Sequence, residues 1–339
     1  MARRWLRLLP VLLALWLALC CGQARADNCT ITPVNLVFPS VSSISTGPVY
    51  ASSTFKVTCN WTDILTGLLT PNVVVCLNLG AGSGNASTTV TAPRQLASGG
   101  LRINYNLYTD ATYAPAKIWG GWTGTSTASN GIVFTMTKSG GVGSLDQFIT
   151  LYGKLEADAN LSGLSVGPDN LTFASTFGAG SAVMNYQFSL LGLLGCAAPQ
   201  TVPIAFAVQA PVINDCTINV GNLAFPNASL LTGAVRTTSS LSVTCSKNTA
   251  YRVTFNAGTY GASTTARRMR NVGNAETVNY QISNTLDGIS WGDGNGGTTA
   301  VTGNGTGMAQ AFTLFGMVPA QATPSPGDYK DVVTATVSF

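Results

Sequence analysis

The chain has 339 residues, of which only 9% are charged, and it contains no histidine. Charged residues usually make up about 25% of a soluble protein, so serine, threonine, asparagine and glycine supply most of the polarity. The absence of histidine excludes Ser-His-Asp and Cys-His catalysis, and without any C-x-x-C pair neither a zinc site nor a haem site is expected.

Residues 1–26 have the pattern of a secretory signal peptide. Three arginines precede an apolar run from Leu8 to Leu19, and Ala24-Arg25-Ala26 forms an A-x-A cleavage site. The run is too short for a membrane span. Cleavage removes four of the seventeen Lys and Arg residues and leaves thirteen basic and thirteen acidic residues. A formal charge of zero indicates neither nucleic acid nor an anionic membrane as a partner.

An internal repeat organises the remaining residues. DNCTITPVNLVFP at Asp27 returns as NDCTINVGNLAFP at Asn214, and further matches follow in the same order, among them FKVTCN with LSVTCS and QFITLYGKLEA with QAFTLFGMVPA. Ordered matches of this kind indicate two copies of one domain. The repeat predicts an N-terminal domain over 27–207, a linker over 208–214 and a C-terminal domain over 215–339.

Six cysteines follow the signal peptide, and an even number in a secreted chain indicates disulfides. Cys29 and Cys59 are separated by 30 positions, and Cys216 and Cys245 by 29. This spacing predicts one bridge within each copy. The two cysteines that remain, in the first copy only, form a third predicted bridge between Cys76 and Cys196.

Short β-branched or aromatic runs separated by Gly, Asn, Pro and Ser predict strands throughout both copies. The fold class expected is therefore all-β, with two β-sandwiches. The last segment alternates, which places Val333, Ala335, Val337 and Phe339 on one face. Two runs after the LYG segment of the first copy, SAVMNYQFSLL and TVPIAFAVQ, predict a hairpin that gives the first domain its own final strand.

The segment NWTDILTGLLTPN is unusually apolar for a loop, and it contains Trp61, Ile64, Leu65, Leu68 and Leu69. Cys59 and Cys76 are 17 positions apart, whereas Cys245 and the matching Thr254 are 9 apart. The first copy has therefore gained about eight residues that the second does without. In an immunoglobulin-like sandwich this is the B–C loop, which lies at the same end as the F–G loop.

Two other segments of the first copy add to this apolar surface. The predicted F–G loop, SLLGLLGCAAP, contains Leu190, Leu191, Leu193 and Leu194. A third insertion, APAKIWGGWTGTST, contains Trp122, which has no counterpart in the second copy, and Trp119, which matches Trp291 and is expected in the core. Three apolar loops in one domain predict a hydrophobic binding tip. The alternative is that these side chains pack under the loops or against the second domain.

The motifs NCTI, VTC, NYNLYTD, WGG and LYGKL of the first copy, with DCTI, WGDG and PSPGDYKDVVTATVSF of the second, resemble the spore coat protein U domain. Such domains occur in subunits of archaic chaperone–usher pili, and two copies after a signal are similar to the two-domain tip adhesin. The resemblance implies immunoglobulin-like pilin domains, the second lacking its last strand, which a neighbouring subunit supplies by donor-strand complementation. It also implies a periplasmic chaperone and an outer-membrane usher as partners.

The expected function is adhesion at a pilus tip on the cell surface, through finger-like loops that contact abiotic or host surfaces. Cleavage would leave only Asp27 and Asn28 before Cys29, so we expect no donor segment and a subunit that terminates the polymer. The open edge at Val333–Phe339 would receive the donor strand or the chaperone. No cofactor or catalysis is expected, because nothing marks a paired-carboxylate or calcium site. The alternative is a freestanding secreted coat or matrix protein, which would fold alone.

Overall fold

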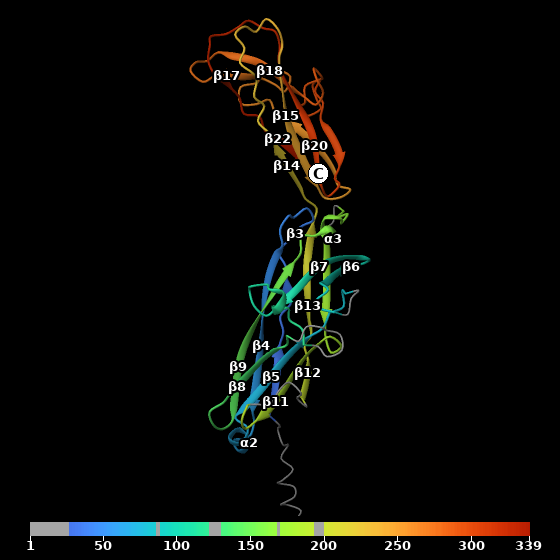
Figure 1. Cartoon of the computed structure of the whole chain (residues 1–339), viewed down its shortest axis with the longest axis vertical. Helices are drawn as coiled ribbons and strands as arrows, with labels where there is room; N and C mark the ends of the chain where they lie inside the picture. Colours follow the sequence, from blue (N-terminus) through green and yellow to red (C-terminus); the bar gives the residue numbers. More distant parts are fainter. Residues whose placement is uncertain (1–26, 86–88, 122–129, 168–169, 193–199) are drawn as a thin grey trace, which may run out of the picture.

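The computed structural model describes residues 27–85, 89–121, 130–167, 170–192 and 200–339, apart from the side chains of residues 65 and 66. These residues form two β-sandwich domains that follow one another along the long axis of the molecule (Figure 1). In the described residues, no helix is both long and apolar enough to cross a membrane.

The N-terminal sandwich has two sheets. The larger one contains, in spatial order, β1 (Asn28–Thr32), β4 (Val49–Trp61), β9 (Gly143–Leu155), β7 (Leu101–Tyr108), β6 (Arg94–Ser98), β10 (Leu171–Phe177), β13 (Phe206–Ile213) and β2 (Leu36–Val37), with β3 (Val41–Ser42) also paired to β13. The smaller one contains β12 (Gln200–Pro203), β11 (Ala182–Ser189), β5 (Asn72–Leu79) and β8 (Ile132–Thr137). The helices in the described parts of the connections are short: α2 (Ile64–Leu69), η1 (Pro115–Lys117) and α3 (Ala159–Ser162).

The C-terminal sandwich repeats this arrangement with fewer strands. One sheet contains β14 (Cys216–Val220), β15 (Val235–Cys245), β20 (Ala309–Val318), β18 (Thr277–Ser283), β17 (Arg267–Asn271) and β21 (Tyr329–Lys330). The other contains β19 (Val301–Asn304), β16 (Ala250–Phe255) and β22 (Ala335–Ser338).

Alternating burial along the strands builds the two cores. On β4, Phe55, Val57 and Cys59 are fully buried while the residues between them are not, because successive side chains of a strand point to opposite faces. Trp119 and Trp291 are both fully buried, as the repeat predicts. The Trp119 indole donates to the carbonyl of Leu77 at 2.9 Å, and the Trp291 indole donates to that of Val253 at 2.9 Å.

Each sandwich also buries one arginine beside its tryptophan. Arg94 donates from Nη2 to the carbonyl of Trp119 at 2.6 Å, and Arg267 donates from Nη2 to the carbonyl of Trp291 at 2.7 Å. Burial lowers the pKa of both guanidinium groups. These repeated contacts fix the residue-by-residue correspondence between the two copies.

Disulfides join Cys29 to Cys59 and Cys216 to Cys245, the pairs expected from the spacing. In both pairs the two cysteines are direct cross-strand partners on the first two long strands of a sandwich. Cys76 is also disulfide-bonded. Cys196 lies outside the described residues, so its bridge to Cys76 stays a prediction.

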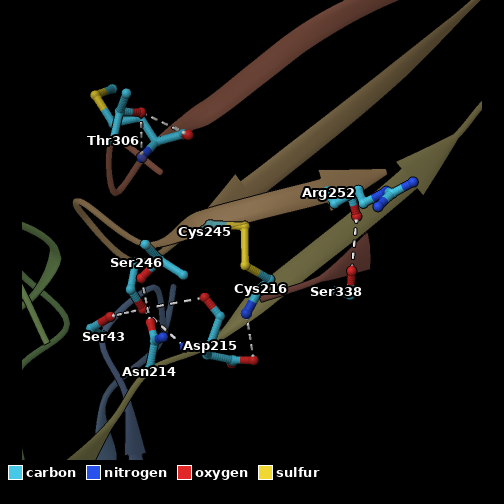
Figure 2. Close-up of a disulfide and its surroundings, with 11 residues drawn as sticks. Ser43, Asn214, Asp215, Cys216, Cys245, Ser246, Arg252, Thr306 and Ser338 are labelled. Carbon is cyan, nitrogen blue, oxygen red and sulfur yellow. Dashed lines mark hydrogen bonds between the residues drawn. A yellow bond between two sulfur atoms is a disulfide. The ribbon is translucent and has the colours of Figure 1, made fainter. Parts of the chain in front are cut away.

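The junction between the sandwiches is built from strand rather than linker. Residues 208–214 were expected to be a linker, but β13 runs to Ile213 and β14 begins at Cys216. The expectation was wrong because proline and asparagine near this run are typical of a domain boundary. The strand that pairs with the run, β10, is distant in sequence, so the local pattern does not reveal the pairing. At the junction Ser43 Oγ lies 2.5 Å from Ser246 Oγ, both fully buried, close to the Cys216–Cys245 bridge (Figure 2).

Candidate strand-acceptor groove and apolar tip loops

The final strand of the N-terminal sandwich shows what completes this fold. β13 pairs antiparallel with β10 and parallel with β2, so it fills the space between them. Its side chains at Phe206, Val208, Ala210 and Val212 point into the core and are almost fully buried. β12 likewise covers the outer edge of β11. The predicted hairpin after β10 therefore supplies the last strand of this domain.

Within the part of the chain that the structure describes, the C-terminal sandwich has the strands that flank this position but no strand in the position itself. β21 corresponds to β10, and β22 corresponds to β11. Both are edge strands, because none of the described residues pairs with their outer edges. The result is an open edge at the position that β12 and β13 occupy in the other copy.

A groove lies at this open edge. It has a volume of about 820 Å³ and runs between residues 223–229 and residues 323–330. The apolar residues that line it include Val235, Met269 and Val318. Residues 223–229 correspond to the segment of β2, since NLAFP repeats NLVFP. The groove therefore lies at the position that β13 occupies in the N-terminal sandwich.

Burial differs between the copies as an unfilled groove requires. Leu36 and Phe38 are fully buried under β13, whereas the matching Leu223 and Phe225 are only half-buried. The predicted edge residues follow the same pattern: Val333, Ala335 and Val337 pack against the core but remain half-buried, and Phe339 is exposed. The corresponding Ala182 and Met184 of β11 are fully buried.

One polar contact lies beside the groove, between β21 and β22. The Tyr280 hydroxyl donates to Asp331 Oδ2 at 2.6 Å, and Asp331 Oδ1 accepts from the backbone N–H groups of Thr259 and Val332. Burial, followed by this hydrogen bond, raises the pKa of Tyr280 well above its usual value. The carboxylate thus holds the bend that separates the two halves of this edge.

The apolar B–C insertion lies at the end of the molecule farthest from the C-terminal sandwich (Figure 1). Within it, residues 64–69 form helix α2 rather than an irregular loop. Ile64, Leu68 and Leu69 are 64%, 59% and 57% exposed. Gly67 packs so closely on the β8–β9 turn that an added Cβ would lie 2.6 Å from the Gly141 carbonyl oxygen. The helix therefore rests on that turn and holds its leucines outward.

Hydrogen bonds tie three connections together at this tip. Asn72 donates from Nδ2 to the carbonyl of Leu190 at 2.7 Å and accepts from Thr137 Oγ1 at 2.6 Å. Leu190 and Leu191 are more than half exposed, and so is Val142 in the β8–β9 turn. Sequence analysis did not identify Val142 as a contact residue. The only sign of it there is a single apolar residue among the glycines of a hairpin turn. We name Ile64, Leu68, Leu69, Val142, Leu190 and Leu191 the tip patch.

Trp61 does not belong to the tip patch, contrary to the sequence-based expectation. It is 1% exposed, its indole donates to the carbonyl of Thr70 at 2.9 Å, and its ring packs edge-on against Phe188. Trp61 is the last residue of β4 and falls on the inward face of that strand. The tryptophan therefore supports the loop from below and does not reach a target surface.

The structure does not describe the side chains of the remaining predicted contact residues. Trp122, Leu193, Leu194 and the side chain of Leu65 are not among the described residues. The described part of the third insertion lies at the other end of β5 from the B–C loop. Gly121 bridges to Leu79, the last residue of β5, whereas the B–C loop enters β5 at Asn72. The described tip consists of the B–C loop, the β8–β9 turn and the start of the F–G loop.

The structure also corrects the length of the B–C insertion and explains it. Leu77 and Val253 are equivalent, and they follow Cys59 and Cys245 by 18 and 8 positions, so the insertion is about ten residues rather than eight. The short loop of the C-terminal sandwich lies against the other domain, where Asn248 Nδ2 donates to Ser165 Oγ at 3.2 Å. The loop is short where it packs on a domain and long where it forms the end of the molecule.

Comparison with known proteins places this chain among relatives. The family model described as the Spore Coat Protein U domain matches residues 16–165 and 203–336. The chain belongs to the spore coat protein U domain family. Protein U of Myxococcus xanthus is 33% identical over 108 residues, which are 30% of this chain and 59% of that protein. The chain thus spans little more than half of this curated relative.

A solved structure has the same fold. It is a chain of the CsuC-CsuE chaperone-tip adhesion subunit pre-assembly complex from archaic chaperone-usher Csu pili of Acinetobacter baumannii. The TM-score is 0.53 at 17% sequence identity, over 92% of this chain and 100% of that chain. The architecture of this spore coat protein U family member is therefore shared at low identity. In the described residues, no group of three or more His, Cys, Asp or Glu side chains could hold a metal ion.

Proposed function

We propose that this chain is the tip adhesin of an archaic chaperone–usher pilus. In the assembled pilus, the C-terminal sandwich accepts a β-strand from an adjacent subunit. Before assembly, a periplasmic chaperone supplies that strand, and the exchange takes place at an outer-membrane usher. The N-terminal sandwich contacts an abiotic or host surface through the tip patch. The protein acts at the cell surface by adhesion, not by catalysis.

The observation that carries this proposal is the groove beside β21 and β22. A sheet edge with no strand paired to it among the described residues, beside half-buried apolar side chains such as Leu223 and Phe225, is a template for another strand. The other copy of the same domain fills the equivalent space with β13. Strand addition at a sheet edge is an established mode of peptide recognition, in which alternate side chains enter pockets. The donor should therefore run antiparallel to β21, as β13 runs against β10.

The tip patch supports the adhesive half of the proposal. Its six apolar side chains are more than half exposed and come from three connections at one end of the molecule. Exposed apolar patches on secreted proteins mark interaction sites. Contact with a hydrophobic surface would remove this area from water, which is favourable in proportion to the area.

A donor-strand fusion tests the acceptor groove. The full chain is extended after Phe339 by a glycine-serine linker of about ten residues, comparable to the F–G connection, and a copy of residues 203–213. The matched control carries the same extension with Asp at the positions copied from Phe206 and Val208. We expect the fusion to be monomeric and to melt at a higher temperature, because the copy supplies the missing apolar face.

The unextended chain and the control should associate or aggregate in size-exclusion chromatography. Equal behaviour of all three proteins, each monomeric with the same melting temperature, would refute the acceptor groove. That result would favour the second candidate, a freestanding secreted coat protein that folds without a partner.

A further inference from the structure

Four tyrosines gather on the side of the N-terminal sandwich, at the opposite end of β4 from Trp61. Tyr113, in the loop between β7 and β8, is the centre of the group. Its ring centroid lies 4.5 Å from that of Tyr50, 5.4 Å from that of Tyr108 and 6.3 Å from that of Tyr152. The three partners come from β4, β7 and β9, which are neighbours in the larger sheet.

This cluster is separate from the main core. Tyr108 is buried against Val90 and Ile118, while Tyr113 and Tyr152 are half-buried and Tyr50 is 46% exposed. Tyr50 and Tyr152 lie on the outer face of the sheet, since the residues next to Tyr152 in sequence, Leu151 and Gly153, are buried. The aromatic rings therefore form a partly open surface rather than the inside of the sandwich.

The second copy shows that the fold does not require these tyrosines. Strand register matches Tyr50 to Arg236, because Tyr50 faces Lys154 on β9 and Arg236 faces Met317 on β20. Arg236 forms a two-bond ion pair with Asp287, in the loop that corresponds to the one holding Tyr113. An exposed ion pair thus occupies the position of the exposed tyrosine pair.

The backbone conformation of this loop shows which of the two residue types, tyrosine or aspartate, it accommodates more easily. Tyr113 and Asp287 both have positive φ, 53° and 50°. Aspartate is among the residues that adopt this conformation most readily, whereas a bulky aromatic residue there is an outlier. The loop geometry therefore accepts aspartate easily, and the first copy carries tyrosine at a cost in backbone strain. Such strain is concentrated at ligand-binding sites.

Two ion pairs lie on the strand and the loop that carry these tyrosines. Lys154, the cross-strand neighbour of Tyr50, forms an ion pair of 2.9 Å with Glu156. On the loop itself, Lys117 lies 3.4 Å from Asp110. Burial raises the pKa of Tyr108 and of Tyr113, so their hydroxyl groups are neutral and can both donate and accept hydrogen bonds. The site thus combines aromatic faces with donors and acceptors and carries no net charge from these pairs.

We propose that Tyr50, Tyr113 and Tyr152, with the Lys154–Glu156 pair, form a binding platform for a neutral saccharide. The C–H groups on one face of a pyranose carry partial positive charge and pack on the negative face of an aromatic ring. Sugar hydroxyls donate to the Glu156 carboxylate and accept from Lys154. Tyrosine suits such contacts because it offers a large amphipathic area at a low cost in conformational entropy. This platform is distinct from the tip patch and from the acceptor groove.

The test transplants the ion pair of the second copy. The full-length double variant Tyr50→Arg/Tyr113→Asp recreates the Arg236–Asp287 arrangement, so it should fold with an unchanged or higher melting temperature. Cellotetraose, maltotetraose and mannotetraose are titrated against wild type and variant by ligand-observed NMR. We expect at least one of them to bind wild type, and the variant to raise its Kd by about tenfold or more, or about 1.4 kcal/mol.

The single variant Tyr50→Ala provides a second measurement in case the double variant fails to fold, and it should weaken binding in the same direction. Failure of all three saccharides to bind wild type, or equal Kd values for wild type and variants, would overturn the proposal. Adsorption to polystyrene through the tip patch should be the same for wild type and variants. A loss of adsorption in a tip-patch variant and a loss of sugar binding here are therefore separate results.

Discussion

The tip patch makes a quantitative prediction for the variant Ile64→Ser/Leu68→Ser/Leu69→Ser. These three side chains are 64%, 59% and 57% exposed, so only about two fifths of each contributes to folding. Complete burial of a leucine or isoleucine contributes about 1.5–3 kcal/mol. The triple change should therefore lower the free energy of unfolding by about 2–4 kcal/mol in total. Contact with a hydrophobic surface can still remove the exposed three fifths from water.

That exposed part corresponds to about 1–2 kcal/mol for each side chain by the same relation, or about 3–5 kcal/mol for the three together. A difference of this size weakens adsorption by about two to four powers of ten. Several pili attached at once would multiply the effect in a cell-based assay. The purified full chain in its donor-strand fusion form gives the cleaner measurement, because that protein is expected to be monomeric and each molecule then carries one tip.

Adsorption isotherms on polystyrene and denaturant melts of the donor-strand fusion, with and without the triple change, measure the two quantities separately. Trp61→Ala is the matched control from the same segment, since Trp61 is fully buried and its loss should cost about 3–5 kcal/mol of stability. The reasoning is wrong if the triple variant is less stable than Trp61→Ala, because the leucines are then structural. It is equally wrong if the triple variant is well folded and adsorbs as wild type does.

Two further predictions concern buried polar groups. Arg94→Met should destabilise the protein by about 2–4 kcal/mol, and Arg267→Met by less. The reason is that Arg94 Nη1 donates to Asn106 at 2.7 Å, whereas among the described residues Arg267 Nη1 has no hydrogen-bond partner. Denaturant melts that rank the two variants the other way would contradict this. Tyr280 keeps its proton in the folded state above its usual pKa near 10, so its contribution to stability is complete below about pH 10 and is lost as the pH rises. The free energy of unfolding should therefore fall more steeply from pH 9 to pH 11 in wild type than in Tyr280→Phe, and parallel slopes would count against it.

Much of the fold could be predicted from the sequence because the relevant signals are local and occur twice. Alternation of apolar and polar residues follows from the two-residue period of a strand, whatever lies across the sheet. The cysteine pairs are cross-strand neighbours at matching separations, and the tryptophans that match in the repeat are buried in both copies. The comparison of copies also revealed the apolar B–C insertion without any knowledge of its shape.

The exposure of each apolar side chain was decided only by the tertiary structure. Trp61 and Leu68 are apolar residues of one segment, yet Trp61 is covered by Phe188 and the loop above it, while Leu68 lies on the outer side of a helix. The third insertion reads like the other two, but it begins at the opposite end of β5. Burial depends on what packs against a residue from distant parts of the chain, and local patterning does not encode that.

The same reason separates the two copies of the domain. The sequence by itself determined that they share strands, a disulfide and a buried tryptophan. Only the assembled sandwiches show that Leu36 and Phe38 are covered by β13 while Leu223 and Phe225 line an open groove. A strand is stabilised by partners on both sides, and whether an edge is covered is a property of the whole sheet rather than of the residues that form it.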